Sequence, residues 1–234
     1  ISDDPLFAGN GRLQAASPCI NVGTNQTWMT GSCDLDGRTR IMGSRVDMGC
    51  FERIVEDEGM SPQHYVSPSG GDVWPYADWA TAARAIQDAV DTAAGSDTVW
   101  VADGLYDAGG AVAAGYALSN RVCVTKCITL QSVNGPEGAF IAGASDSGTN
   151  GPAAVRCLYV EAGAAVSGFT LTNGHTFFSG DYEDIEGGGA YLADGSISNC
   201  VIAGNSAAYN GGGLWGGSLT SLVTHCVFRG NTAA

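Results

Sequence analysis

Three segments of the chain repeat one pattern of apolar and small residues, and this repeat limits the fold more than any other feature. Each segment ends in a Gly-Asn or Asn-Gly pair: VSGFTLTNG (166–174), ISNCVIAGN (197–205) and VTHCVFRGN (223–231). The stretches GGGAY (187–191) and GGGLW (211–215) follow the first two copies. The apolar positions lack the 3.6-residue period of a helix, and strands of about four to six residues fit between the glycines and asparagines.

A strand this short cannot bury its apolar side alone. Stacking one copy on the next pairs the backbones and covers that side, which is how solenoids are stabilised. The sequence therefore predicts an all-β parallel β-helix whose equivalent residues stack about 4.8 Å apart. Phe169, Cys200 and Cys226 share one register, so we expect them to form one inward ladder. At the following corner we expect asparagines with left-handed backbone angles, namely Asn173, Asn205 and Asn231.

A short amphipathic helix precedes the repeats. The pattern predicts a helix near 79–94, with Asp78 as its N-cap and Gly95 just after its end. Its apolar stripe consists of Ala82, Ala85, Ile86, Ala89, Val90 and Ala93. Such a helix would cover the first coil, whose edge is otherwise open to pairing. Trp79 and Trp100 are expected in the core beneath this cap. Residues 64–234 then form a capped β-helix that is open at its C-terminal end.

The first 53 residues are irregular and rich in turn-forming residues, and 54–63 has the acidic, patternless composition of a linker. The stretch YVSPSGGD…WATAARAIQDAV…GSDTVWVADGLY resembles the opening of bacterial secreted right-handed β-helix proteins of the pectin-lyase-like superfamily. Residues 1–53, with DPLF…GRLQAASPCINVG…RVDMGCFE, resemble the choice-of-anchor type segment that closes such proteins. The GNSA and GGG repeats are similar to those of adhesin-like surface proteins. The resemblance implies a right-handed β-helix and an extracellular or cell-surface location.

The closing segment precedes the opening segment in this chain. Residues 1–53 are therefore expected to complete the open β-helix of a preceding or neighbouring unit, since free edge groups are satisfied by strand addition. A contact of this head-to-tail kind, which does not close on itself, builds a filament. The predicted interface consists of Leu6, Phe7, Leu13, Cys19 and Ile20 of one unit and Cys226, Val227 and Phe228 of the next. The units are either tandem repeats of one giant chain or separate copies that polymerise.

Charge and hydropathy exclude some partners. The formal net charge is −14, with 10 lysines and arginines against 24 acids. Nucleic acids and anionic membrane surfaces require a basic patch, so neither is an expected partner. No apolar run approaches the roughly 20 residues of a membrane span. The predicted partners are other copies or repeats of the chain, together with glycans.

Relatives of this fold include polysaccharide lyases and glycosidases, so a glycan-active enzyme or a carbohydrate-binding module is the alternative function. A glycosidase needs two carboxylates placed across the sugar. The acids of this chain are scattered, and Arg156 is expected to be a solvated surface arginine, so no residue is assigned to catalysis. The run DYEDIE (181–186) is expected to be a solvated loop, with Ca²⁺ as the one cation considered and no other cofactor. Trp215, after the second GGG corner, is the candidate glycan contact.

Eight cysteines and few lysines favour an oxidising compartment in which disulfides persist. Cys33 and Cys50 are expected to form a disulfide that stabilises the closing segment by about 2–4 kcal/mol. Cys123 and Cys127 can bridge only if the chain bends between them. Cys200 and Cys226 stack, either as a thiol ladder or as a disulfide. Cys19 and Cys157 have no evident mate, which leaves a bond between units open.

Overall fold

The structure is a computed structural model that describes residues 4–7, 12–14, 17–29, 32, 34–35, 40–41, 45–52, 63–95, 97–161 and 163–233. It divides into two compact units, Ile1–Ser61 and Pro62–Ala234. In the described part of the first unit, the chain forms a 3-10 helix, η1 (Thr27–Met29), and an antiparallel bridge between Phe7 and Leu13. Of the predicted linker over 54–63, Gln63 alone lies within the described residues, and it begins the first strand of the second unit.

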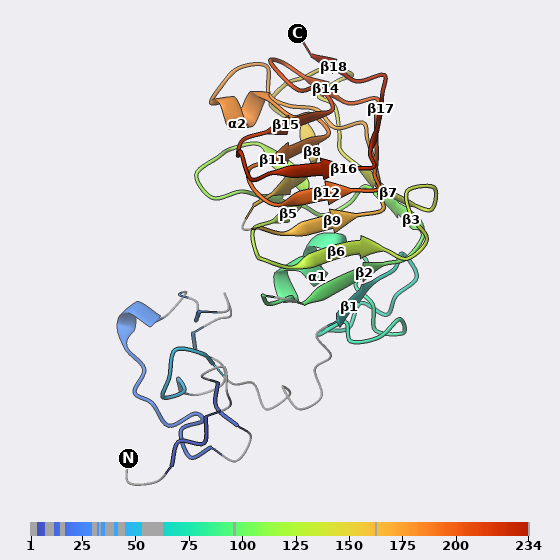
Figure 1. Cartoon of the computed structure of the whole chain (residues 1–234). Coiled ribbons are helices and arrows are strands. Elements are labelled where there is room, and N and C mark those ends of the chain that lie inside the picture. The colour runs from blue at the N-terminus through green and yellow to red at the C-terminus, as the bar shows by residue number, and fades with distance from the viewer. Residues whose placement is uncertain are drawn as a thin grey trace. The chain divides into compact units, whose positions relative to one another are not determined.

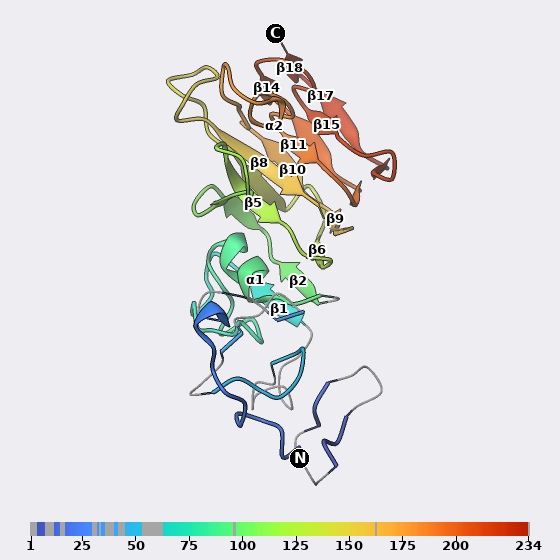
Figure 2. The same cartoon turned by 90° about the vertical axis from the view of Figure 1, so that its left-hand side faces the viewer.

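The second unit is a right-handed parallel β-helix built from three sheets, so the predicted fold is confirmed (Figures 1 and 2). The first sheet contains β1 (Gln63–Val66), β2 (Thr98–Val101), β6 (Thr129–Ser132), β9 (Ala165–Ser167), β12 (Ser196–Ser198) and β16 (Leu222–Thr224). The second contains β3 (Gly104–Tyr106), β7 (Ala139–Ala142), β10 (Thr170–Thr172), β13 (Val201–Ala203) and β17 (Val227–Arg229). The third contains β4 (Ala111–Val112), β5 (Ser119–Val124), β8 (Val155–Val160), β11 (Ala190–Leu192) and β15 (Leu214–Gly216).

Each coil runs from the third sheet to the first and then to the second. All strand pairs within these sheets are parallel except β4 with β5. A further parallel pair, β14 (Ser206–Ala207) with β18 (Thr232–Ala233), lies at the corner that leads back to the third sheet. Equivalent positions of successive coils are therefore held in one register by main-chain hydrogen bonds.

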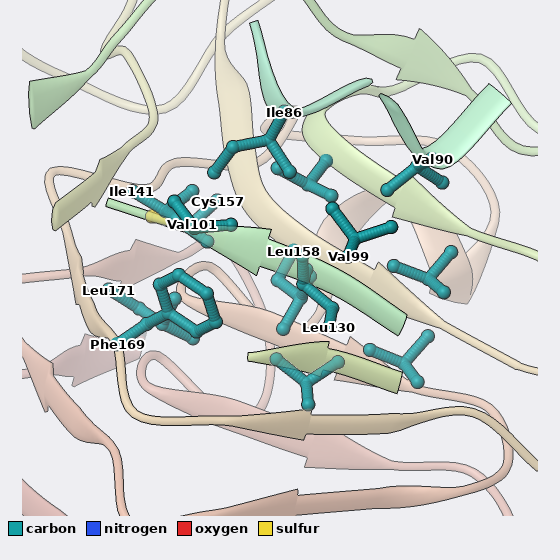
Figure 3. Packing of buried hydrophobic residues seen from close by; sticks show 14 of the residues in the cluster. Ile86, Val90, Val99, Val101, Leu130, Ile141, Cys157, Leu158, Phe169 and Leu171 are labelled. Atoms are coloured by element: carbon teal, nitrogen blue, oxygen red, sulfur yellow. The ribbon is translucent and has the colours of Figure 1, made fainter. Parts of the chain in front are cut away.

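Aliphatic ladders fill the inside of the coils (Figure 3). In the first sheet the inward row is Val99, Leu130, Val166 and Ile197, each 0–1% exposed. Phe169 and Cys200 extend this core at the bend between the first and second sheets. Both are equally buried, which confirms the predicted inward ladder for those two positions. Burial of each such side chain is worth about 1.5–3 kcal/mol.

The cap differs in detail from the prediction. The helix α1 covers only Ile86–Thr92. Asp78 does accept a hydrogen bond from Thr81 N, at 2.8 Å, but it closes a turn rather than the helix. Ala83 pairs with Val66 as an extra strand-like bridge, so the helix cannot begin before it. At the other end the chain becomes extended at Ala93, ahead of Gly95.

Of the six residues in the predicted apolar stripe, five are nevertheless buried and Ala85 is half-buried. Ala82, Ile86, Ala89, Val90 and Ala93 are all at most 2% exposed. The two tryptophans expected beneath the cap are not core residues. Trp79 is 44% exposed, and Trp100 lies at a half-exposed position of β2 whose two neighbours point inward.

In each of the last three coils, two bends place one residue in the left-handed region. Between the first and second sheets these residues are Gly168 (φ 85°), Asn199 (φ 49°) and His225 (φ 53°). After the second sheet they are Asn173 (φ 55°), Gly204 (φ 66°) and Gly230 (φ 60°). The prediction of left-handed asparagines is thus correct for Asn173 and wrong for Asn205 and Asn231, because glycine takes that position in the later copies.

The glycine-rich corners exist because adjacent coils approach closely there. A Cβ atom on Gly189 would overlap with the Gly213 carbonyl oxygen of the next coil and lie 2.8 Å from Asn205 Nδ2. The GGG motif therefore marks backbone-to-backbone contact between coils.

We predict that Gly189→Ala lowers the free energy of unfolding by about 1–3 kcal/mol, the usual cost of overpacking. The control is Gly216→Ala, since a Cβ on Gly216 meets nothing within 4 Å. Urea denaturation followed by circular dichroism measures both. Equal stability of the two variants would show that the corner has room for a side chain.

Candidate assembly interface

The last described coil pairs on one side only. Its strands β15, β16, β17 and β18 pair with β11, β12, β13 and β14 of the coil before. In the described part of the chain, no strand pairs with their other edges. Such an edge presents main-chain donors and acceptors in the spacing that a further parallel strand would use.

The inward positions of this coil are exposed where their counterparts are buried. Val223 is 36% exposed, whereas Ile197, its partner in register, is 0% exposed. Phe228 is 49% exposed, and its partner Ile202 is 0% exposed. Beside them lies a groove of about 370 Å³, lined by Gly212, Gly213, Leu214, Phe228, Arg229, Gly230, Asn231 and Ala233. The last described coil thus exposes apolar side chains at positions that are buried in the coils before it.

A ladder of asparagine hydrogen bonds extends to this coil. Asn205, 1% exposed, donates from Nδ2 to Leu171 O of the preceding coil (3.0 Å) and accepts from Gly174 N (2.8 Å). Asn231 repeats this contact one coil later, donating from Nδ2 to Ile202 O at 2.8 Å and accepting from Asn205 N at 3.1 Å. Each Gly-Asn pair therefore fastens its coil to the one before it.

The opposite end of the β-helix is covered. The Gln87 side chain of α1 accepts from Cys123 N (2.8 Å) and donates to Cys123 O (3.3 Å), so its amide replaces the backbone of a missing strand. Lys126 Nζ donates to the carbonyls of Asp91 (2.7 Å) and Ala93 (2.8 Å) at the end of the helix. At this end of the β-helix, the Gln87 amide of α1 pairs with the open edge of β5, and Lys126 satisfies carbonyls at the end of the helix.

The structure places the predicted N-terminal interface residues within the first unit. Leu13 and Cys19 are buried there, at 5% and 2% exposure, and Leu6 and Ile20 are half-buried. Phe7 is 51% exposed. On the C-terminal side, Val227 is 54% exposed and Cys226 half-buried beneath Cys200 of the coil before.

The acidic insert is folded, which corrects the expectation of a solvated loop. Its helix α2 (Tyr182–Ile185) brings Asp184 to 4% exposure, and Glu186 is 3% exposed. Asp184 accepts from Leu118 N (2.9 Å) and Ala117 N (3.1 Å), and Glu186 accepts from Asn210 Nδ2 (2.7 Å). The carboxylates are buried because main-chain and amide donors surround them.

Arg156 holds the other side of the insert and is 1% exposed, so the expectation of a surface arginine is wrong. Its guanidinium donates to the carbonyls of Gly187 (2.9 Å), Glu186 (2.7 Å) and Glu183, and to Asn120 Oδ1 (2.9 Å). It also lies over the Tyr191 ring, 5.2 Å from the centroid. Burial lowers the pKa of Arg156 to about 10, so the side chain stays charged at neutral pH. Sequence reasoning missed this role because strand position alone does not reveal a covering insert.

We predict that Arg156→Met lowers the free energy of unfolding by about 3 kcal/mol or more, because several buried carbonyls lose a charged donor. Arg229→Met on the terminal coil, where the residue is exposed, is the control and should change stability by less than about 0.5 kcal/mol. Chemical denaturation of both variants measures the difference. A mild effect at Arg156 would mean that the insert folds without it.

The structure has no disulfide among the cysteines that it describes. All described cysteines are free thiols: Cys19, Cys50, Cys123, Cys127, Cys157, Cys200 and Cys226. Cys33, the expected mate of Cys50, lies outside the described residues. Cys123 is buried among tyrosines on the outer side of β5, whereas Cys127 is exposed in the following turn, so the two point apart.

Cys200 and Cys226 form the stacked thiol ladder instead of a bond. Each thiol donates to a carbonyl two residues earlier, Cys200 to Ser198 O (3.2 Å) and Cys226 to Thr224 O (3.3 Å). The neighbouring Cys226 thiol, followed by burial, raises the pKa of Cys200. The neighbouring Cys200 thiol lowers the pKa of Cys226.

We predict that iodoacetamide at pH 7.5 alkylates Cys127 rapidly in the native protein and leaves Cys123 and Cys157 unmodified. Burial raises the pKa of both protected thiols to about 12, so neither forms the reactive thiolate at this pH. Mass spectrometry before and after denaturation, without reductant, measures the pattern. If Cys200 and Cys226 resisted alkylation after denaturation, the two would be disulfide-bonded in the purified protein.

Trp215, the predicted glycan contact, is half-buried on the outer side of the third sheet. It continues the row Cys123, Tyr159 and Tyr191 on successive coils and packs against that cluster. Tyr159 and Tyr191 stack with ring centroids 5.7 Å apart, and both are nearly buried. This row forms a second small core beneath the 107–118 loop, of which Trp215 is the outermost ring.

Among the described residues, no group of three or more His, Cys, Asp or Glu side chains comes together as a metal site. Among the helices of the same residues, none has the length and apolar character to cross a bilayer. His64 lies beside Asp97, with Nε2 3.2 Å from Oδ2, and joins β1 to the turn before β2.

Comparison with family models, with curated proteins and with solved structures found no match to this chain.

Proposed function

We propose that this chain is a structural unit of an extracellular fibre or of a large cell-surface adhesin, in which β-helical units assemble head to tail. The observation that carries the proposal is the difference between the two ends of the β-helix. One end is closed by α1 and the Gln87 amide, whereas the other presents Val223 and Phe228 at inward positions with open strand edges.

The partner in this proposal is a unit of the same kind, either the next repeat of one chain or a separate copy. Its segment 1–53 would complete the last coil, and Phe7 is the most exposed of the five residues of that segment assigned to the contact. Membership of the pectin-lyase-like superfamily and a choice-of-anchor role for the closing segment belong to the same proposal. The right-handed parallel β-helix and the Gly-Asn ladder support the first of these.

The alternative of a glycan-active enzyme has less support. A glycosidase would need carboxylates free to approach a sugar. The buried carboxylates of the insert, Asp184 and Glu186, are instead held by main-chain and amide donors. Arg156, the base nearest to them, is engaged by four acceptors.

We predict that the purified chain self-associates with rising concentration and that Val223→Lys with Phe228→Lys abolishes this, since two charges would be placed on the apolar end. Sedimentation velocity and negative-stain electron microscopy measure the change. The control carries Leu105→Lys and Val133→Lys, which are 58% and 47% exposed but lie away from the last coil.

Circular dichroism establishes that both double variants are folded. A wild-type chain that stays monomeric at high concentration would contradict assembly between separate copies. Equal loss of association in both variants would place the contact elsewhere than on the last coil.

A further inference from the structure

A groove of about 480 Å³ lies between α1 and the 107–118 loop, at the start of the third sheet. Figure 2 shows α1 beside β5, the strand that forms the base of this groove. The residues that line it include Gln87, Asp91, Val112, Cys123, Thr125 and Glu161. Pockets for small molecules usually measure about 300–1,000 Å³. The groove therefore has room for a small organic ligand.

The lining contains two charged residues, Asp91 and Glu161, which lie on either side of Thr125. The helix α1 lies along one edge of β5, because the Gln87 amide pairs with the Cys123 backbone there, and Asp91 follows Gln87 by one helical turn. The strand β8 pairs with the other edge of β5, and this register continues to Glu161 beside Thr125. The two carboxylates thus come from different elements and face one groove.

Neutral donors hold both carboxylates in place. Asp91 accepts a hydrogen bond from Gln87 Nε2 at 2.8 Å, and Glu161 accepts one from the Tyr159 hydroxyl at 2.7 Å. Among the ion pairs between described residues, none includes either carboxylate. The Lys126 ammonium donates to main-chain carbonyls of α1. The two negative charges are therefore oriented but not neutralised.

The Cys123 thiol lines the buried side of the groove. It is 4% exposed, and over residues 63–95, 97–161 and 163–233 its sulfur takes part in no hydrogen bond. Burial, followed by the charges of Glu161 and Asp91, raises the pKa of this thiol to about 12, so it stays neutral. A neutral sulfur accepts weakly from N–H groups and packs well against methylene groups. A ligand in the groove would thus meet an unused polar atom beside the two charges.

These features suit an organic cation better than a metal ion. Ca²⁺ takes six to eight oxygen ligands, and among the described residues no three His, Cys, Asp or Glu side chains come together. Two carboxylates with Thr125 between them match two ammonium groups that are joined by an aliphatic chain. Val112 and the Cys123 thiol offer apolar contact to the methylene groups of such a chain.

We propose that this groove binds a linear aliphatic diamine or polyamine, with one ammonium group at Asp91 and the next at Glu161. The neutral hydrogen bonds to Gln87 and Tyr159 hold the carboxylates ready, so binding orders few side chains. The site is independent of the end-to-end assembly, because it lies beside the cap and not on the last coil.

The test is titration calorimetry of the full chain with cadaverine and spermidine, with butylamine as the comparison that carries one ammonium group. We expect cadaverine to bind about ten-fold more tightly than butylamine or better, because it reaches both carboxylates. Raising NaCl from ~0.01 M to ~1 M should abolish this binding, since the Debye length falls from about 30 Å to about 3 Å.

Two isosteric variants and two matched controls locate the site. Asp91→Asn and Glu161→Gln each remove one charge and keep an oxygen that accepts the existing hydrogen bond, so in each variant cadaverine should bind no more tightly than butylamine. The controls are Asp88→Asn, on the same helix, and Glu137→Gln; both residues are exposed and lie outside the groove. They should keep the preference for cadaverine, and circular dichroism establishes that all four variants are folded.

Three results would overturn the proposal: no binding of cadaverine or spermidine, equal affinity of the wild type for cadaverine and butylamine, or loss of the preference in the controls. A fourth is displacement of cadaverine by an equal concentration of Ca²⁺, which would make the groove part of a generally acidic surface without a specific site.

Discussion

Parallel pairing of one coil with the next is the interaction on which the whole second unit depends. It aligns Leu130, Val166 and Ile197 into a buried row and brings the corner backbones so close that Gly189 admits no side chain. The Asn205 amide fastens its coil to the one before it at the corner. Each coil is stable only against a neighbour, as in other solenoids. At the start of the stack, where no earlier coil precedes, α1 and the Gln87 amide take the place of a neighbour.

The repeat made most of this architecture predictable. Because strand register has a period of two, aligning the three copies was enough to place Phe169 and Cys200 inside. The length of the cap was not predictable from its alanine-rich pattern. Ala83 pairs with Val66, a contact between distant segments that no local propensity reports, and this contact delays the start of α1. The same limit applies to Trp79 and Trp100, whose apolar character suggested burial although their positions face outward.

The burial of charged residues and the bonding state of the thiols were harder to predict from the sequence, for a related reason. Arg156 and Asp184 look like surface residues in the sequence, since charges are rarely buried without partners. Their partners are main-chain groups of a loop and a corner, which become visible only once the coils are stacked. An even number of cysteines suggested disulfides. The ladder position that brings Cys226 below Cys200 fits small apolar side chains equally well, so the count alone could not decide between them.

The corner between the second and third sheets varies in length without disturbing the stack. Val166, Ile197 and Val223 are in register although 31 residues separate the first two and 26 the last two. The additional residues form the insert, which is anchored through Arg156 and leaves the strand spacing unchanged. Loop length and coil geometry are therefore separable variables in this scaffold. A protein engineer or natural selection can lengthen this corner to display a new epitope while the supporting rod keeps its pitch.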